Sequence, residues 1–282
     1  MLEQFQKLRL NVKIALLGVG GVLFAAVALL GLAVWQSGQY NRLAQNEVEQ
    51  LISADLDHIT EGVYNLVRTE NEAFQQQVSY NLKIARYMLK NAGGISFSPE
   101  TVRWNAVNQL SLQAVDVRLP KMMVGNRWLG QNSSISVPTP LVDDISSLVS
   151  ETTTVFQRMN RQGDMLRVAT TVVGKNGRRA IGTYIPAIAP DGTKNPVIEM
   201  VTRGETYHGR AFVVNDWYLT AYEPIRDASG EIVGMLYGGV PQRYVEARLR
   251  QAILQTRVGK TGYVYVLSGK GVDRGRYIVS HR

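Results

Sequence analysis

Hydroxyl-bearing side chains recur at every second position in the segment WYLTAYE, residues 217–223. In a β-strand, successive side chains point to opposite faces. One face of this strand then carries three hydroxyls, from Tyr218, Thr220 and Tyr222. We expect the opposite face to lie in the core; it carries Trp217, Leu219 and Ala221. Because binding pockets combine an aromatic lining with a few polar groups, the hydroxyl-bearing face is a candidate ligand site.

A basic side chain is predicted to complete this site. Arg210 follows His208 by two positions, so both lie on one face of the preceding strand. A guanidinium beside tyrosine and threonine hydroxyls makes a good carboxylate receptor. Further contributions are expected from the segment RRAIGTY, in a loop over the sheet: Arg179, Thr183 and Tyr184. The alternative is an exposed sheet face, with Arg210 solvated and the tyrosines serving as strand formers.

The residue types present argue against catalysis and against a resident cofactor. The chain has no cysteine, which excludes disulfides, thiolate metal sites and cysteine nucleophiles. Its three histidines, His58, His208 and His281, show no metal-ligand spacing. Asp143 and Asp144 are adjacent, so on a helix they point in different directions and suit no carboxylate dyad. We therefore expect no enzyme, no metal and no cofactor.

Two features suggest nucleic acid or nucleotide binding, and neither is supported in detail. The net charge is +8, but residues 1–13 carry +2 and residues 243–282 carry +7, which leaves −1 for residues 14–242. A nearly neutral central region is not a nucleic-acid surface. The triplet GKT at residues 259–261 follows a predicted helix, and Leu254 stands where a phosphate-binding loop needs glycine.

An apolar run predicts a membrane anchor. Residues 14–34 contain no charged side chain, and about 21 residues form a helix of roughly 31 Å, enough to cross the hydrocarbon core. Trp35 follows at the expected interface. Lysine and arginine precede the run and mostly acidic residues follow it, which places residues 1–13 in the cytoplasm. A cleaved signal peptide is the alternative, but the run is too long and no small-x-small site follows before Gln36.

Beyond the anchor, periodic apolar residues predict one long helix over residues 36–92. The apolar positions recur at three or four residues: Leu43, Leu51, Ile52, Ile59, Val63, Leu66, Val67, Phe74, Val78, Leu82, Ala85 and Leu89. The segment NAGG, residues 91–94, is a typical helix end. We expect one side of this stripe to pack on the following domain and the membrane-proximal part to form a homodimer through the long helix.

The remaining residues predict an α+β fold with an antiparallel sheet. Short alternating segments are joined by turns such as RDASG, residues 226–230, and predicted helices lie near residues 141–149 and 195–204. We expect a ligand-binding domain over residues 93–241, a connecting helix over residues 242–257 and the start of a second, incomplete module over residues 258–282. A sheet that begins at Gly262 cannot be completed in about 20 residues.

Three stretches resemble a known family: GKNGRRAIGTYIP, the segment from VIEMVTRG to MLYGGV, and VGKTGYVYVLSGKG. They are similar to the extracytoplasmic Cache sensor region of bacterial methyl-accepting chemotaxis proteins, of the fused Cache 3/Cache 2 type, most closely over residues 178–240. The resemblance implies a PAS-like sheet on a long membrane-adjacent helix, a small-molecule ligand and no catalysis. It also implies a second membrane helix, a HAMP linker and a cytoplasmic signalling domain, none of which the chain contains.

These features together predict the sensory region of a protein of the bacterial inner membrane. The sequence as given is expected to cross the membrane once, with the bulk of the chain in the periplasm. Its partners are expected to be a small solute such as an organic anion, the membrane and a second copy of the chain, and not nucleic acid. The same sensor could belong to a histidine kinase or a cyclic-dinucleotide enzyme. A membrane-anchored structural protein, in which the sheet merely packs, and an extracytoplasmic hydrolase are the rival classes.

Overall fold

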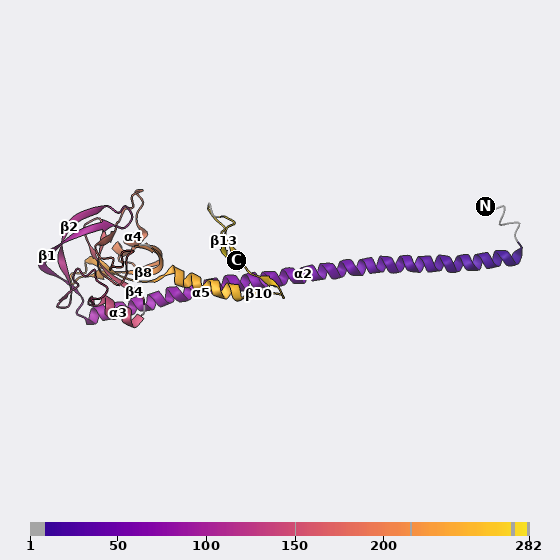
Figure 1. Cartoon of the computed structure of the whole chain (residues 1–282), viewed down its shortest axis with the longest axis horizontal. Helices are drawn as coiled ribbons and strands as arrows, with labels where there is room; N and C mark the ends of the chain where they lie inside the picture. The colour runs from indigo at the N-terminus through magenta and orange to yellow at the C-terminus, as the bar shows by residue number, and fades with distance from the viewer. Residues whose placement is uncertain (1–8, 150, 215, 272–273, 281–282) are drawn as a thin grey trace. The chain divides into compact units, whose positions relative to one another are not determined.

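The structure is a computed structural model that describes residues 9–149, 151–214, 216–271 and 274–280. It divides into two compact units, Met1–Tyr64 and Asn65–Arg282. One helix, α2 (Leu10–Asn91), begins in the first unit and ends in the second (Figure 1). Each unit has its own pattern of exposed and buried side chains.

In the first unit, the helix exposes a long series of apolar side chains. Ile14, Phe24 and Val34 are 61, 77 and 73% exposed. A helix beginning at Val12 is long and apolar enough to cross a membrane, judged by length and composition. Exposed aliphatic side chains at this density are costly in water and favourable in lipid, which agrees with the anchor predicted over residues 14–35.

In the second unit, the same helix buries one stripe. Phe74, Val78, Leu82, Ala85 and Leu89 recur at three or four residues and are all buried. The helix ends at Asn91, where Gly93 and Gly94 adopt φ angles of 103° and 68°. The Gly94 N–H donates to the Leu89 carbonyl at 2.9 Å, so the glycines satisfy carbonyls that the helix end leaves open.

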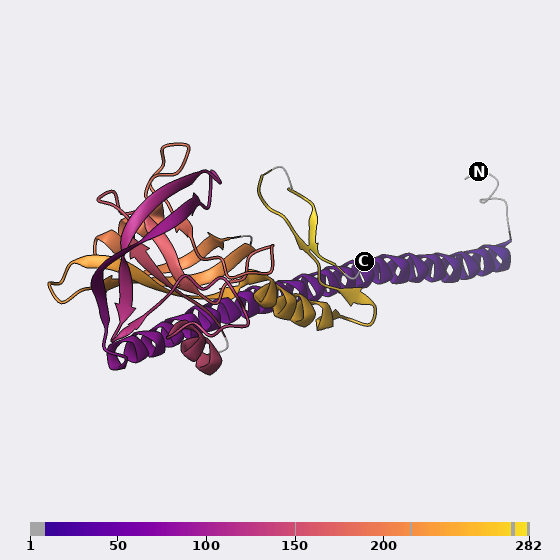
Figure 2. The same cartoon turned by 60° about the vertical axis from the view of Figure 1, so that its left-hand side comes forward.

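Figure 2 shows the strands of the second unit as arrows. They form a nine-stranded sheet of order β3-β2-β1-β6-β5-β4-β9-β8-β7. Its strands are β1 (Ile95–Asn108), β2 (Ala114–Val124), β3 (Arg127–Trp128), β4 (Thr152–Arg158), β5 (Met165–Thr170), β6 (Thr183–Ile185), β7 (Tyr207–Val213), β8 (Asp216–Arg226) and β9 (Ile232–Pro241). Strands β1 and β6 pair in parallel, and the other described neighbours are antiparallel. The predicted α+β class is confirmed.

Short helices flank the sheet. They are α3 (Val142–Val149), α4 (Pro196–Thr202) and α5 (Gln242–Gln255). Helix α4 begins where the sequence indicates, because the Asn195 side chain accepts from the Val197 N–H at 3.0 Å and proline follows at the first helical position. The last residues form two small hairpins, β10 (Arg257–Val258) with β11 (Gly262–Tyr263) and β12 (Val266–Leu267) with β13 (Tyr277–Val279).

The central strands are buried on both faces by two separate cores. The first core joins α2 and α3 to one face and includes Val78, Ile145, Leu219 and Leu236. The second core covers the other face with α4 and adjoining loops; among its members are Phe156, Ile185, Val197, Ile198, Val201, Tyr218, Tyr222, Met235 and Tyr237. The two faces of β8 therefore have different neighbours, as alternation in its sequence predicts.

Candidate ligand-binding site

A bulge between β4 and β5 brings an unexpected arginine onto the hydroxyl-bearing face. Val155 pairs with Ala169, but the next residue of β4, Phe156, pairs with Arg167, so Val168 is one extra residue in β5. Residues directly opposite each other in an antiparallel pair share a face. Arg167 therefore projects from the same face as Phe156, and so does Thr170 beyond the bulge.

The pairing register extends this face from β5 through β4 and β9 to β8, and Thr183 adds a residue of β6. Phe156 lies opposite Met235, Thr154 lies opposite Tyr237, and Tyr237 lies opposite Tyr222. In the structure, the hydroxyl-bearing face includes residues of neighbouring strands in addition to those of β8. Its members are Thr154, Arg167, Thr170, Thr183, Tyr218, Thr220, Tyr222 and Tyr237. Every member except Thr183 is buried.

Arg167 is a charged side chain in the interior of the second unit. It is 1% exposed. Its Nη1 donates to Thr183 Oγ1, its guanidinium carbon lies 5.0 Å from the centre of the Phe156 ring, and its Nε has no hydrogen-bond partner. Among the residues that the structure describes, no aspartate or glutamate forms an ion pair with it. Burial lowers the pKa of Arg167, and the nearby tyrosines oppose that shift without reversing it.

The tyrosines around it are neutral hydrogen-bond donors. Burial raises the pKa of both Tyr222 and Tyr237 above the ordinary tyrosine value, so both keep their protons at physiological pH. Their ring centroids lie 4.9 Å apart. The Tyr237 hydroxyl lies 3.2 Å from Thr152 Oγ1. A guanidinium fork beside neutral hydroxyls is a donor set that suits one carboxylate.

This face is filled in the structure. Tyr222 and Tyr237 are each 1% exposed, and Thr220 is fully buried. This face is covered by α4 and by the rest of the connection between β5 and β7. The connection is mostly irregular and includes two isolated bridges, Val173 to Arg179 and Ile188 to Lys194. A ligand can reach Arg167 only when this cover moves.

Four of the seven residues predicted for the site lie on this face. Tyr218, Thr220 and Tyr222 share it as alternation predicts, and Thr183 reaches Arg167 from β6. Thr220 Oγ1 already donates to the Gly209 carbonyl at 2.9 Å, so its proton holds β7 to β8. Which of these side chains touch a ligand stays a prediction.

The predicted placement of Arg210 beside the three hydroxyls is wrong. Arg210 pairs with Leu219, which places it on the face opposite the three hydroxyls. Its side chain is exposed and its guanidinium carbon lies 4.1 Å from the centre of the Trp217 ring. Trp217 is predicted in the core, but it is 42% exposed. It lies at the start of β8, where its indole meets the Phe212 ring edge to face and lies beside the Arg210 guanidinium.

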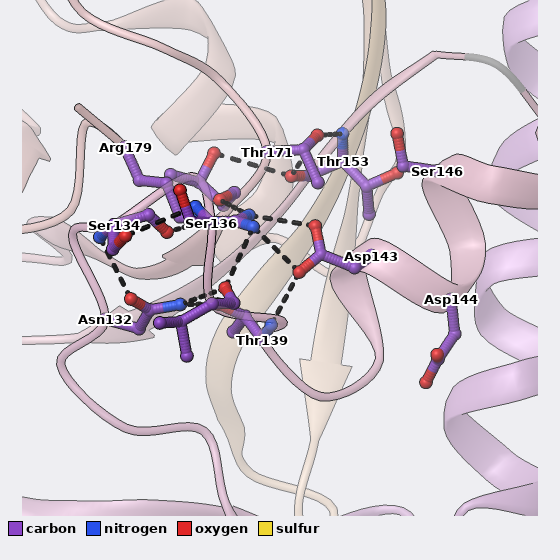
Figure 3. A network of polar contacts seen from close by, with 12 residues as sticks. Asn132, Ser134, Ser136, Thr139, Asp143, Asp144, Ser146, Thr153, Thr171 and Arg179 are labelled. Carbon is purple, nitrogen blue, oxygen red and sulfur yellow. Dashed lines mark hydrogen bonds and ion pairs between the residues drawn. The ribbon is translucent and has the colours of Figure 1, made fainter. Parts of the chain in front are cut away.

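The guanidinium of Arg179 is occupied by an ion pair and by backbone carbonyls (Figure 3). Two of its nitrogens bind the Asp143 carboxylate, each at 2.9 Å. The remaining donors reach backbone carbonyls, including Ser134 at 2.7 Å and Thr170 at 2.8 Å. Asp143 also accepts from the Thr139 N–H at 2.5 Å, so this ion pair ties α3 to two loops. The guanidinium has no donor left for a ligand.

Tyr184 also lies away from the predicted site. Its hydroxyl accepts from Asn108 Nδ2 at 3.3 Å, and its ring packs against the first core. Tyr184 neighbours Thr183 in β6, so alternation turns the two side chains to opposite faces.

Arg167 is the residue that sequence reasoning missed. The strand MLRVAT holds one charged side chain among apolar and hydroxyl-bearing neighbours, which is an available signal. Its orientation depends on the bulge at Val168, and no glycine or proline marks that bulge in the sequence.

The fold is that of Cache-type sensor domains, in which a long N-terminal helix precedes a largely antiparallel sheet. The profile of the Cache 3/Cache 2 fusion domain matches residues 41–282, and the chain belongs to this family.

Comparisons with individual proteins are more distant. Two matching solved structures are the sensory domain of the Campylobacter jejuni chemoreceptor Tlp3 (CcmL) and the E. coli DcuS sensor domain. Tlp3 is 11% identical over 73% of this chain and 68% of its own, with a TM-score of 0.35. DcuS is 16% identical over 39% of this chain and 69% of its own, with a TM-score of 0.26. No curated protein sequence matches.

Proposed function

We propose that the chain is the extracytoplasmic sensing region of a bacterial transmembrane chemoreceptor, and that it binds a small organic anion at Arg167. The observation that supports this proposal is a fully buried guanidinium with no carboxylate partner among the described residues. An uncompensated buried charge is strongly unfavourable, so a bound carboxylate would stabilise the protein by completing the pair. The family assignment to a sensor domain agrees with ligand binding and not with catalysis.

The location proposed for the sensor outside the cytoplasm rests on the first unit and its flanks. Residues 14–34 are uncharged, and Lys7, Arg9 and Lys13 precede them. Short cytoplasmic segments next to a membrane helix are rich in lysine and arginine. In this proposal residues 1–13 face the cytoplasm, residues 36–92 form the extracytoplasmic helix and residues 93–241 form the ligand-binding domain.

Signal transmission is proposed to pass through the sheet to α2. Strand β8 presents Tyr222 to the hydroxyl-bearing face, while its opposite face places Leu219 in the same core as Val78 and Leu82 of α2. Arg86 of α2 also donates to Glu223 of β8 at 3.0 Å. A ligand that moves the tyrosines would therefore shift the strands against α2, and small helix displacements are an established way to switch a receptor. In a homodimer paired through α2, that displacement would occur relative to the partner helix.

Calorimetry on the full chain in detergent micelles tests the binding step. The probes are acetate, butyrate and succinate, with butyramide as the uncharged control for butyrate. We expect at least one carboxylate to bind and butyramide not to bind. Arg167→Met removes the charge at similar volume and is expected to abolish binding, whereas the matched variant Arg210→Met is expected to retain it. Equal carboxylate binding by wild type and Arg167→Met would overturn the Arg167 site.

If Arg167 has only a structural role and binds no ligand, a different result is expected. In that case, no carboxylate would bind to the wild-type chain, and none would raise its unfolding temperature. A ligand raises stability in proportion to the logarithm of its concentration over Kd, so thermal unfolding at increasing butyrate gives an independent measurement.

A further inference from the structure

A second buried ionisable side chain, Glu151, is one of the residues that line a cleft near the start of β4. The cleft encloses about 490 Å³, within the range of small-molecule sites, and is bordered by Gln77 of α2, Ser146 of α3, Glu151 and Tyr244 of α5. Glu151 is 7% exposed. It precedes β4, and its backbone carbonyl accepts from Ser146 Oγ at 2.7 Å, which fixes its position beside the cleft.

The Glu151 carboxylate has no hydrogen-bond partner among the described residues. Both of its oxygens are buried and neither accepts a bond. Burial raises the pKa of this carboxyl, and the neighbouring side-chain amides of Asn81 and Gln77 lower it by less. A buried carboxylate without an ion-pair partner is unfavourable, so the group requires either a proton or a cation.

The cationic side chain that lines the cleft already has an anionic partner. Arg243 lines the cleft, but it forms an ion pair with Asp216, and its guanidinium carbon lies 5.1 Å from the centre of the Tyr244 ring. Glu151 forms no ion pair with any residue that the structure describes. The Arg243 and Asp216 charges cancel, which leaves Glu151 as the unbalanced charge of the cleft.

We propose that this cleft binds the primary ammonium group of a small organic cation, with Glu151 as its counter-ion. A primary ammonium has three N–H donors, and the cleft offers three kinds of acceptor in the Glu151 carboxylate, the Gln77 amide oxygen and the Ser146 hydroxyl. A divalent metal is disfavoured, because the described residues contain no group of three His, Cys, Asp or Glu side chains placed to hold one.

The cleft also lies where binding would affect two helices. Gln77 belongs to α2, and Arg243 and Tyr244 belong to the first turn of α5. Tyr218 lines the cleft as well as belonging to the hydroxyl-bearing face, so the cleft and the Arg167 site share one side chain. The cleft is nevertheless a site of opposite charge preference, and its existence does not depend on anion binding at Arg167.

The test uses the full chain in nanodiscs, with butylammonium chloride as the probe and butanol as its uncharged counterpart of the same length. We expect butylammonium to bind and butanol to bind at least about tenfold more weakly, the difference that a charge-assisted hydrogen bond supplies. Glu151→Gln is expected to weaken butylammonium binding about tenfold or more. Glu72→Gln, an exposed glutamate paired with Arg68 on α2, makes the same charge change elsewhere and is expected to leave binding unchanged.

Two results would overturn the proposal: equal binding of butanol and butylammonium, or unchanged butylammonium binding by Glu151→Gln. If that variant does not fold, photo-crosslinking of the wild-type chain with a diazirine-bearing primary amine decides. Labels on the segments that contain Gln77 and Tyr244 support the site, and labels confined to other segments reject it. Butyrate binding measured in parallel on the same samples reports on Arg167, so the two sites succeed or fail separately.

Discussion

Two buried arginines in this protein have opposite surroundings. Arg179 is 7% exposed and makes two bonds of 2.9 Å to Asp143, with backbone carbonyls accepting from its other nitrogens. Arg167 is 1% exposed and has a hydroxyl and an aromatic ring as neighbours, with Nε unpartnered. The first guanidinium is satisfied by the protein, and the second is not.

The comparison separates a buried charge that the protein pairs from one that it leaves unpaired. A buried ion pair is strongly destabilised when one partner is removed, because the other charge stays buried and unpaired. In the wild-type protein, the charge of Arg167 is already buried without a carboxylate partner among the described residues. The same substitution should therefore have opposite effects on stability at the two positions, and the sign of the effect tells the two roles apart.

Arg179→Met should give the largest effect. It leaves Asp143 and several carbonyls buried without a donor, so we expect a loss of about 3–5 kcal/mol in the free energy of unfolding. Urea unfolding of the purified chain measures it. Arg178→Met, at the exposed neighbouring arginine, is the matched control and should change little. A loss below about 1 kcal/mol for Arg179→Met would show that the Arg179–Asp143 ion pair does not stabilise the fold as proposed.

Arg167→Met should stabilise the ligand-free protein. A hydrophobic side chain then replaces a charge that lacks a partner, which removes the cost of burying that charge. Replacement of a whole buried ion pair by apolar side chains is neutral or stabilising by up to about 4 kcal/mol, and we expect a gain within that range. The urea midpoint should rise while carboxylate binding is lost. A destabilisation as large as that of Arg179→Met would show that Arg167 holds the fold together, and the comparison would fail.

The buried acid Glu151 extends the comparison to the opposite charge. Burial raises its pKa above the ordinary value of 4.5, so the folded protein binds a proton that the unfolded chain has released. The stability of the wild-type chain should therefore fall as pH rises from 4.5 through the raised pKa. Glu151→Gln keeps the shape without the titration.

The measurement for Glu151 is the difference in unfolding free energy between wild type and Glu151→Gln at several pH values. Below the ordinary pKa the difference should be constant, and with rising pH it should increasingly favour the glutamine variant. A difference that instead favours the wild type more at higher pH would mean that the carboxylate has a favourable partner in the folded protein.

Arg210→Met should have the smallest effect. The side chain is exposed and its contact with Trp217 is a surface cation–π contact, which contributes about 0.5–1 kcal/mol at most. We expect a change in unfolding free energy of about 0.5 kcal/mol and unaltered carboxylate binding. Loss of carboxylate binding in this variant would restore Arg210 as the receptor.

Local sequence patterns predicted the helices and strands. Which side chains lie together at the candidate site depends on long-range strand pairing. Alternation in WYLTAYE separates the hydroxyls of β8 from Leu219 and Ala221, and the Asn195–Pro196 start marks α4. The partner of those hydroxyls could not be predicted in the same way. A bulge at Val168 turns Arg167 inward, and the β7 to β8 register turns Arg210 away.

The second failure of prediction concerns Arg179. Its place beside Thr183 and Tyr184 in the sequence indicates a shared site, but Asp143, far away in the chain, takes up its guanidinium. Asp143 and Asp144, in the first turn of α3, accept backbone N–H bonds from Thr139 and Leu141, which precede the helix. Nothing in the local sequence indicates that one of them also binds an arginine.

The most direct test of the unpaired arginine is a crystal structure of the full chain grown with saturating butyrate. The account predicts a butyrate carboxylate within about 3.2 Å of the Arg167 nitrogens, with the cover of the hydroxyl-bearing face displaced and the Arg179–Asp143 pair unchanged. Butyrate bound elsewhere while Arg167 keeps its present neighbours, or no bound butyrate at all, would contradict it.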